Sequence, residues 1–155
     1  MDEDNYLVET TMEDIDFLAP RLRKADVEEC KAASGMEPKE VLIEGLKAGH
    51  FTFTLTPRKG VRVGLWGVVK SPTYDNAGII WMMATEELLE YQIKFLRRSR
   101  VYIELVQKEF PLLHNVVDAR NELHIKWLKF MGFKFIQRHE NFGVAKLPFY
   151  EFLRI

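Results

Sequence analysis

The stretch LLHNVVDARNELHIKWLKFMGFKF, residues 112–135, decides how this chain folds. Its first eight residues form an apolar run of the length of a buried strand. Residues 121–131 then carry apolar side chains at helical spacing, and Gly132 is a typical residue just after a helix end. Residues 133–140, FKFIQRHE, read as a further strand. A strand, a helix and a strand in this order predict a crossover within one sheet.

Three strands and one long helix are predicted before this crossover. The strands alternate apolar and polar residues or form a short apolar run, and Pro57 to Gly60 supply turn residues between the first two. The predicted strands are residues 51–56, 61–69 and 78–85. Residues 86–109 contain no Gly or Pro and repeat apolar residues at spacings of three and four, so we expect a single helix that Pro111 ends. A last strand within residues 143–153 closes a hairpin through Asn141, Phe142 and Gly143.

The first fifty residues predict a short strand and three helical segments. Thr11 and Asp14 have the spacing of a capping box, while Gly35 and Gly49 mark the ends of the next two helices. The predicted elements are a strand at 6–10 and helices from Thr11, from Arg21 and from Pro38. Antiparallel strands followed by a crossover indicate one mixed α/β domain over residues 1–155.

Composition excludes several classes of protein. There are 22 basic and 23 acidic residues, a formal charge of −1, so no strong nucleic-acid signal exists. Cys30 is the only cysteine and lies on an apolar helical stripe, which favours a buried thiol over a nucleophile. The four histidines show no metal-ligand spacing, and we expect no metal. No apolar run reaches the roughly 20 residues of a membrane span.

The order of elements and the string RNELHIKWLKFMGFKF, residues 120–135, resemble the GNAT acetyltransferases. Their last crossover begins with an Asn and ends with Gly-Phe, and Asn121 and Gly132-Phe133 occupy those places. The resemblance implies an α/β fold with a mixed, mostly antiparallel sheet flanked by helices. It also implies acetyl-CoA as cofactor. In that alternative, the cofactor-binding residues are Met83, Ala84, Thr85 and Asn121.

Two features that this resemblance implies are missing. The GNAT diphosphate loop carries two small residues, usually Gly, whose amides hold the phosphates. The matching residues here are Ala84 to Leu89, which include two glutamates, and no glycine occurs between Gly78 and Gly132. Leu128 stands where the GNAT motif has a Tyr that protonates the leaving thiolate. We therefore expect no catalytic residue and no cofactor, with an active acetyl-CoA-dependent N-acetyltransferase as the alternative.

Two further segments, residues 28–38 and 124–135, are similar to small internal virion proteins of short-tailed, podovirus-type bacteriophages. This resemblance implies a non-catalytic GNAT-like scaffold that acts through protein contacts in virion morphogenesis. Its partners would be other phage virion proteins or a second copy of the chain, in the host cytoplasm during infection or in the virion. A phage-encoded inhibitor of a host protein is a third alternative.

Two groups of residues are candidates for such contacts. One is a basic cluster on the long helix, formed by Lys94, Arg97, Arg98 and Arg100; its simpler interpretation is a solvated helix face, because acids balance that helix. The other is aromatic and lies near the end of the sequence: Phe149, Tyr150 and Phe152. That segment is either the last strand of the sheet or an apolar tail. The first twenty residues hold seven acids and no Lys or Arg, so they could pair with the basic cluster of another copy.

Overall fold

One seven-stranded sheet organises the structure, a computed structural model that describes residues 6–155. The strand order is β1-β2-β3-β4-β5-β7-β6, and β4 with β5 is the only parallel pair within the described residues. The strands are β1 (Leu7–Glu9), β2 (Phe51–Leu55), β3 (Gly64–Lys70), β4 (Ala77–Ala84), β5 (Leu112–Asp118), β6 (Lys134–Phe142) and β7 (Leu147–Arg154). The predicted mixed, mostly antiparallel sheet is confirmed.

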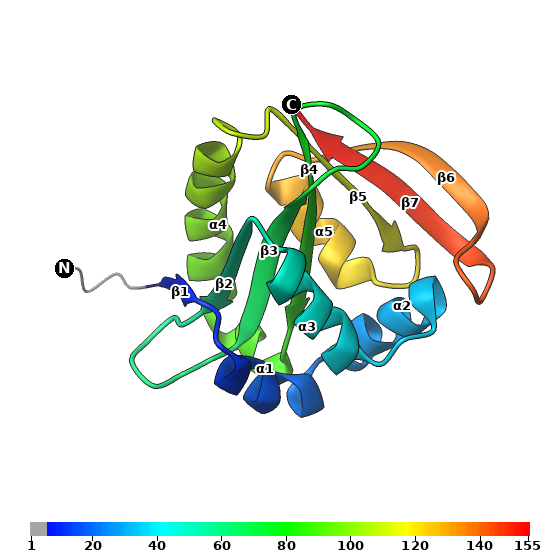
Figure 1. Ribbon diagram of the computed structural model, residues 1–155. Coiled ribbons are helices and arrows are strands. Elements are labelled where there is room, and N and C mark those ends of the chain that lie inside the picture. Colours follow the sequence, from blue (N-terminus) through cyan, green and yellow to red (C-terminus); the bar gives the residue numbers. More distant parts are fainter. Residues whose placement is uncertain (1–5) are drawn as a thin grey trace.

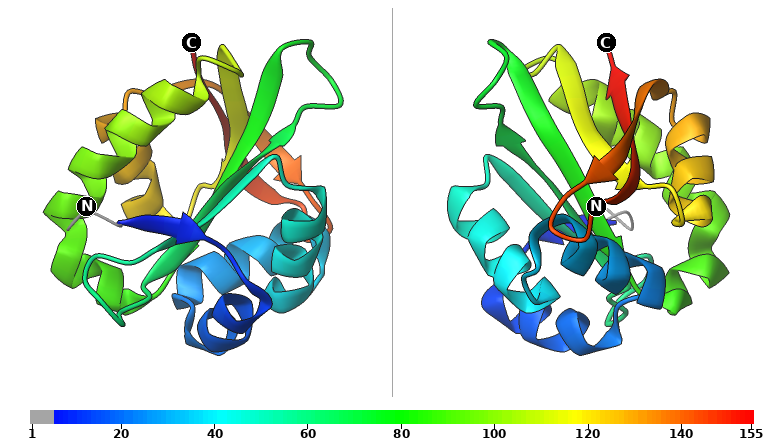
Figure 2. Two further views of the ribbon diagram at one scale, coloured as in Figure 1. Left: turned by 60° about the vertical axis from the view of Figure 1, so that its left-hand side comes forward. Right: turned by 90° about the vertical axis from the view of Figure 1, so that its right-hand side faces the viewer.

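Helices cover both faces of this sheet. They are α1 (Met12–Leu18), the short 3-10 helix η1 (Ala19–Arg21), α2 (Lys24–Ser34), α3 (Pro38–Ala48), the 3-10 helix η2 (Glu86–Tyr91), α4 (Gln92–Val106) and α5 (Glu122–Phe130). Figures 1 and 2 show α1, α2 and α3 on one face and α4 and α5 on the other. The order of strands and helices agrees with the sequence-based expectation, so the crossover through α5 is confirmed.

Local sequence signals explain where the N-terminal helices begin and end. The Thr11 hydroxyl accepts from the Asp14 amide at 3.2 Å, and the Asp14 carboxylate accepts from the Thr11 amide at 3.0 Å, which completes the predicted capping box. Pro38 opens α3 in the position where its missing N–H costs nothing. Gly35 ends α2 with a left-handed backbone. These boundaries fix α2 and α3 against the sheet.

The core has two parts, one on each face. The larger lies between the sheet and the helices α4 and α5, and includes Trp66, Phe95 and Trp127. The smaller lies under α1 and α3 and includes Ile15 and Leu42. This division follows the alternation of side chains along β3 and β4, which directs neighbouring residues to opposite faces.

The long helix differs from the expectation at its start. Residues 86–109 are predicted as one helix, but residues 86–91 form the 3-10 helix η2 and α4 begins only at Gln92. The tighter helix places residues three apart on the same side. Leu88 is completely buried and Tyr91 packs against the same core cluster, so a spacing of three brings both side chains inward.

The hairpin of β6 and β7 is confirmed, but its turn lies later than Asn141 to Gly143. Asn141 and Phe142 belong to β6, and the turn runs over residues 143–146. Gly143 and Lys146 adopt a left-handed backbone there, with φ of 73° and 52°. The Val144 and Ala145 amides donate to carbonyl oxygens at the end of α2. Contact with α2 therefore determines where the turn forms.

The apolar segment within residues 143–153 is a strand and not a tail. It forms β7, which pairs with β5 on one side and β6 on the other. Phe149 is 1% exposed and Phe152 3% exposed, whereas Tyr150 is partly buried. The first two side chains are part of the interior and form no exposed aromatic patch.

Two further observations concern residues 6–155. No helix in this range combines the length and apolar character that crossing a bilayer requires. The same residues contain no group of three or more His, Cys, Asp or Glu arranged to hold a metal ion. Three of the N-terminal acids proposed to pair with another copy, Asp2, Glu3 and Asp4, lie outside the described residues.

Candidate functional site

The two parallel strands at the centre of the sheet separate after three residue pairs. Residues 77–79 of β4 pair with residues 112–114 of β5, and no further backbone pair follows. The Asn115 side chain takes over, because its Nδ2 donates to the Ile80 carbonyl oxygen at 2.7 Å. Beyond Ile80 the strands diverge and leave a wedge in the sheet.

A cavity of about 350 Å³ occupies this wedge. Its α4 and α5 side is formed by Phe95, Ser99 and Leu128, among others, and its opposite side by residues of α2, α3 and β4 such as Trp81. Apolar side chains dominate the lining. The volume falls within the range of about 300 to 1,000 Å³ typical of small-molecule sites.

The edge of β4 that faces the wedge is only partly available. Because the Thr85 amide donates to the Val63 oxygen, alternation along β4 turns the backbone groups of Met82 and Ala84 towards β5. The Ala84 carbonyl accepts from the Arg23 amide at 2.8 Å, and its amide donates to the Asp26 carboxylate at 2.9 Å. Only Met82 therefore offers a backbone donor and acceptor beside the cavity.

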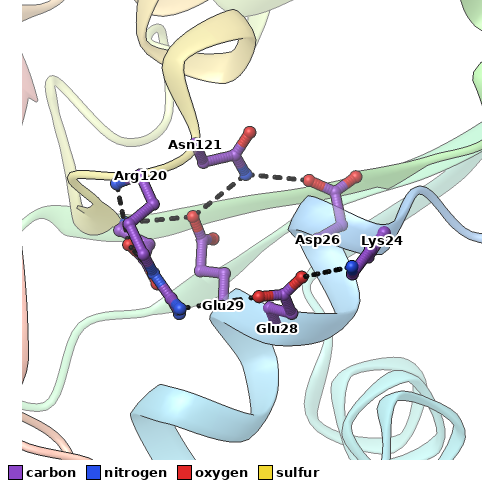
Figure 3. A network of polar contacts seen from close by, with 7 residues as sticks. Lys24, Asp26, Glu28, Glu29, Arg120 and Asn121 are labelled. Atoms are coloured by element: carbon purple, nitrogen blue, oxygen red, sulfur yellow. Dashed lines mark hydrogen bonds and ion pairs between the residues drawn. The ribbon is translucent and has the colours of Figure 1, made fainter.

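A buried polar network joins the start of α2 to the start of α5 (Figure 3). The Asn121 Nδ2 donates to Asp26 at 2.9 Å and to Glu29 at 3.2 Å, while its Oδ1 accepts from the Arg23 guanidinium at 3.2 Å. Arg23 also pairs with Asp26 at 3.0 Å. Since an amide side chain has two N–H groups and one oxygen, every group of Asn121 has a partner.

Burial changes the protonation of three groups at the cavity. It raises the pKa of the Glu29 carboxyl from 4.5 to about 8, and the charges of Asp26 and Asp118 act in the same direction. Hydrogen bonds from the Asp118 amide and Asn121 oppose this shift in part. Burial lowers the pKa of His124 and raises the pKa of the Cys30 thiol to about 11. At neutral pH all three groups are therefore largely uncharged.

The comparisons with known proteins rest on structure. No protein-family model and no curated protein matches the sequence. Solved structures match over nearly the whole length: Ard1 from Thermoplasma volcanium has a TM-score of 0.74 at 16% identity and covers 96% of this chain and 95% of its own. The chain has the GNAT acetyltransferase fold. Identity this low establishes the fold alone.

Two other GNAT-fold matches are described as complexes with CoA. An acetyltransferase from Bacillus subtilis in complex with CoA has a TM-score of 0.67 at 13% identity, covering 95% of this chain and 94% of its own. Spermidine N-acetyltransferase from Vibrio cholerae in complex with CoA and spermine has a TM-score of 0.66 at 12% identity, covering 96% and 93%. None of the three links the fold to phage virion proteins.

The position of the GNAT diphosphate loop does not fit a diphosphate in this chain. An anion site at a helix start needs backbone amides that point outwards and are unbonded. In η2 the Leu88 amide donates to the Thr85 oxygen at 3.2 Å, and the amide at the start of α4 donates to the Leu89 oxygen. Glu86 and Glu87 are exposed in the first turn of η2. The Leu88 amide is therefore already used, and the two exposed carboxylates oppose phosphate binding.

The residues of the acetyl-CoA alternative come close together but are occupied. Met83 packs under α1 and α3, Ala84 is completely buried, and Asn121 belongs to the network around Asp26. The Thr85 hydroxyl donates to the Val63 oxygen at 3.1 Å. Each has a structural role in the GNAT fold, whether or not a cofactor binds.

No proton donor stands at the GNAT tyrosine position. Leu128 occupies it, is 4% exposed and lines the cavity. The neighbouring Trp127 donates its indole N–H to the Gln92 side chain at 2.8 Å. An indole is also too weak an acid to protonate a thiolate at neutral pH.

The basic residues of α4 have different surroundings. The Lys94 ammonium donates to the Pro57 oxygen at 2.7 Å, and Arg100 lies over the Phe130 ring, 5.7 Å from its centre. The positive charge of Arg98 acts on Tyr6, whereas Arg97 is exposed to solvent. Tyr150, from the aromatic group, lies on another part of the molecule and accepts from Arg138 at 2.8 Å.

Several residues around the cavity are missing from the sequence-based candidates. Ser99 lies four residues from both Phe95 and Ile103, so a small polar residue interrupts an apolar helical stripe. That spacing was a usable signal. Arg23, Asp26 and Glu29 gave no such signal, because their partners are about ninety residues away in sequence.

Proposed function

We propose that this chain is a GNAT-fold protein that does not transfer acetyl groups from acetyl-CoA and acts through binding. The observation that carries the proposal is η2. It stands where the diphosphate of the cofactor would lie and presents the Glu86 and Glu87 carboxylates there, while the Leu88 amide is already bonded to the Thr85 oxygen. A diphosphate there would face repulsion of about 1 kcal/mol from each nearby carboxylate, even when solvent screens the charges.

The occupied edge of β4 supports the same proposal. Arg23 and Asp26 take the backbone groups of Ala84 on the side of the wedge. A ligand extended along β4 towards η2 would have to displace this buried pair. Leaving Arg23 or Asp26 unpaired in the interior costs several kcal/mol, by an order-of-magnitude estimate.

Calorimetric titration of the full chain with acetyl-CoA and with CoA tests the proposal. We expect no saturable heat at micromolar concentrations of either ligand. The variant Glu86→Gln with Glu87→Gln removes both charges and serves as the comparison, because weak binding that appears only there would assign the block to charge. Micromolar binding to the unaltered chain, or release of CoA in the presence of amines, would contradict the proposal.

An acetyltransferase with an unusual donor site is the second candidate. The wedge between β4 and β5, the cavity within it and the backbone groups of Met82 favour it, as do the CoA complexes among the matching structures. The same titration separates the two candidates, because the enzyme must bind its acyl donor.

The partner class follows from the resemblance to internal virion proteins of short-tailed phages, which rests on residues 28–38 and 124–135 and on the spacing between them. Within this proposal the chain contacts other virion proteins or a second copy of itself. Mass spectrometry of purified particles of the phage concerned provides the test. We expect the chain in fixed proportion to the other internal proteins, and its absence from washed particles would contradict a virion role.

A further inference from the structure

Four of the residues that line the cavity between β4 and β5 carry a buried polar atom without a hydrogen-bond partner. These atoms are the Ser99 hydroxyl, the Nδ1 of His124 and the indole nitrogens of Trp66 and Trp81. Only one other buried side-chain N or O atom of residues 6–155, the Tyr6 hydroxyl, lacks a partner. Buried polar groups are normally hydrogen-bonded, so this concentration in one cavity indicates a place where a ligand supplies the missing partners.

The chemistry of these groups restricts the ligand. An indole N–H can only donate, while a hydroxyl and an uncharged imidazole nitrogen can donate or accept. Ser99 is 5% exposed, Trp66 5% and His124 7%, so all three belong to the interior. A complementary molecule therefore carries at least one acceptor oxygen.

The apolar part of the lining around Ser99 disfavours a charged ligand. Phe95, Ile103 and Phe152 surround the same space, and a full charge placed among them would lose its hydration without gaining an opposite charge. Carboxyl groups stand at the other side of the cavity, where Glu29 and Glu44 line it. The Glu44 carboxylate makes an anionic ligand still less favourable.

We propose that this cavity binds an uncharged, mostly apolar small molecule that carries a hydrogen-bond acceptor oxygen. The inference rests on the proposed function, since it assigns the wedge to a ligand other than acetyl-CoA. Such a ligand needs neither a diphosphate site nor the backbone groups of Ala84 on the edge of β4, which Arg23 and Asp26 already bond.

The exposed lining residues indicate where the ligand enters. Ser34 of α2 and Glu44 of α3 are exposed, and Met36 and Val41 between them are half-buried. The opening therefore lies between α2 and α3. Glu86 and Glu87 do not line the cavity, so the route is separate from the position of the GNAT diphosphate.

Fluorescence titration of the full chain with Prodan, an uncharged naphthyl ketone, tests the proposal. We expect one-to-one saturable binding and emission shifted to shorter wavelength, because the probe leaves water. Displacement then compares 2-acetonaphthone with 2-naphthoate, which have similar shapes but differ in charge. The ketone should displace Prodan at a concentration lower by about tenfold or more, because the carboxylate must give up its hydration to enter the apolar cavity.

Two substitutions on α4 locate the probe. Ser99→Leu fills the cavity and should weaken Prodan binding by about tenfold or more, whereas Val101→Leu adds a methylene on the exposed side of the helix and should leave it unchanged. Ser99→Ala keeps the space and removes only the hydroxyl, so we expect affinity lower by about fivefold. Thermal melting of each variant identifies any that fails to fold, and Met82→Phe is the alternative filling variant.

The outcomes separate this inference from the proposed function. No saturable Prodan binding, equal binding by folded cavity-filled variants, or equal displacement by the carboxylate would overturn the inference alone. Displacement of Prodan by micromolar acetyl-CoA would instead overturn the proposed function, because the wedge would then be a cofactor site. Prodan binding that the filled variants lose and that acetyl-CoA leaves intact supports both.

Discussion

At the scale of single residues, the protonation of Glu29 links the cavity to stability. Its carboxyl lines the cavity and accepts hydrogen bonds from the Asp118 amide and from Asn121. The folded protein holds the proton up to about pH 8, whereas the unfolded chain releases it near the ordinary value of 4.5. Ionisation of this group therefore opposes folding, and the opposition grows as the pH rises through this window.

Glu29→Gln should raise stability at alkaline pH and leave it nearly unchanged at acid pH. The amide imitates the protonated carboxyl and keeps its accepting oxygen, so the cost of ionisation disappears. We expect a gain of about 1 kcal/mol or more above about pH 8, or roughly 3 °C in Tm, and little gain near pH 5. Thermal melts at both pH values measure it, with Glu28→Gln, whose side chain is 44% exposed, as the control. A gain that does not depend on pH would contradict the raised pKa.

At the scale of elements, α2 is held to β4 by side chains and not by apolar packing alone. The Asp26 carboxylate accepts the Ala84 amide, the Arg23 guanidinium and the Asn121 amide, so three separate parts of the chain meet on one residue. Removal of such a buried charged acceptor leaves its donors without partners.

Asp26→Ala should destabilise the protein by about 3 kcal/mol and expose the edge of β4. Hydrogen exchange measures the second effect directly, since the Ala84 amide should exchange faster than in the unaltered chain while amides of β6 and β7 change less. Glu28→Ala, two residues further along α2 and with a side chain 44% exposed, is the control and should have little effect. An unchanged Ala84 exchange rate would show that Asp26 is not what protects this edge.

The contact between the β6–β7 turn and α2 also belongs to this scale. Gly143 has φ of 73°, and a Cβ added there would clash with the Ala32 carbonyl oxygen. Gly60 has φ of 80° but no atom within 4 Å of such a Cβ. The two glycines therefore share a left-handed backbone and differ in the space around them.

Gly143→Ala should cost more stability than Gly60→Ala. Both variants pay about 1 kcal/mol for a left-handed alanine, and the first adds the displacement of the turn from α2, for a total of about 3 kcal/mol. Urea denaturation of both variants gives the difference. Equal losses would contradict the close contact between the turn and α2.

At the scale of the whole molecule, the sheet depends on β7. This strand lies between β5 and β6, so both depend on it for pairing on that side of the sheet. Phe149 and Phe152 also carry interior packing, at 1% and 3% exposure. β7 is therefore an interior strand of the sheet, although it is the last strand in the sequence.

Deletion of residues 147–155 should prevent cooperative folding. The loss of two strand pairings and two buried phenylalanines exceeds the marginal stability of about 5 to 15 kcal/mol of a typical domain. Circular dichroism and thermal melting measure the result, and Ile155→Ser, at an exposed position, is the control. A cooperative melt of the shortened chain would contradict this role and restore the interpretation of the segment as a tail.

The sequence was sufficient to predict most elements, because hydrophobic periodicity and turn residues are local signals. The three-strand meander, the crossover through α5 and the capping box at Thr11 all follow from residues close in sequence. The absence of glycine from residues 84 to 89 predicts a poor diphosphate loop, and the titration with acetyl-CoA tests that prediction. The sequence missed the break between η2 and α4, since the inward direction of Leu88 and Tyr91 depends on the core.

The candidate site was predictable only in part. Asn121 was identified from the GNAT resemblance, but its partners Arg23, Asp26 and Glu29 come from a helix far away in sequence. The free hydroxyl of Ser99 and the orphaned nitrogen of His124 depend on how two helices and a split sheet leave space between them. Such properties of packing are not encoded in any local pattern.

The central position of β7 also affects the order in which the sheet can assemble on the ribosome. The strands β1 to β4 are antiparallel neighbours in chain order. When β2, β3 or β4 is synthesised, the strand with which it pairs has already left the ribosome. On the other side, β5 and β6 emerge before the strand that joins them. Nascent chains thus carry two open strand edges for a time, which makes this half of the protein the part most dependent on chaperones during synthesis.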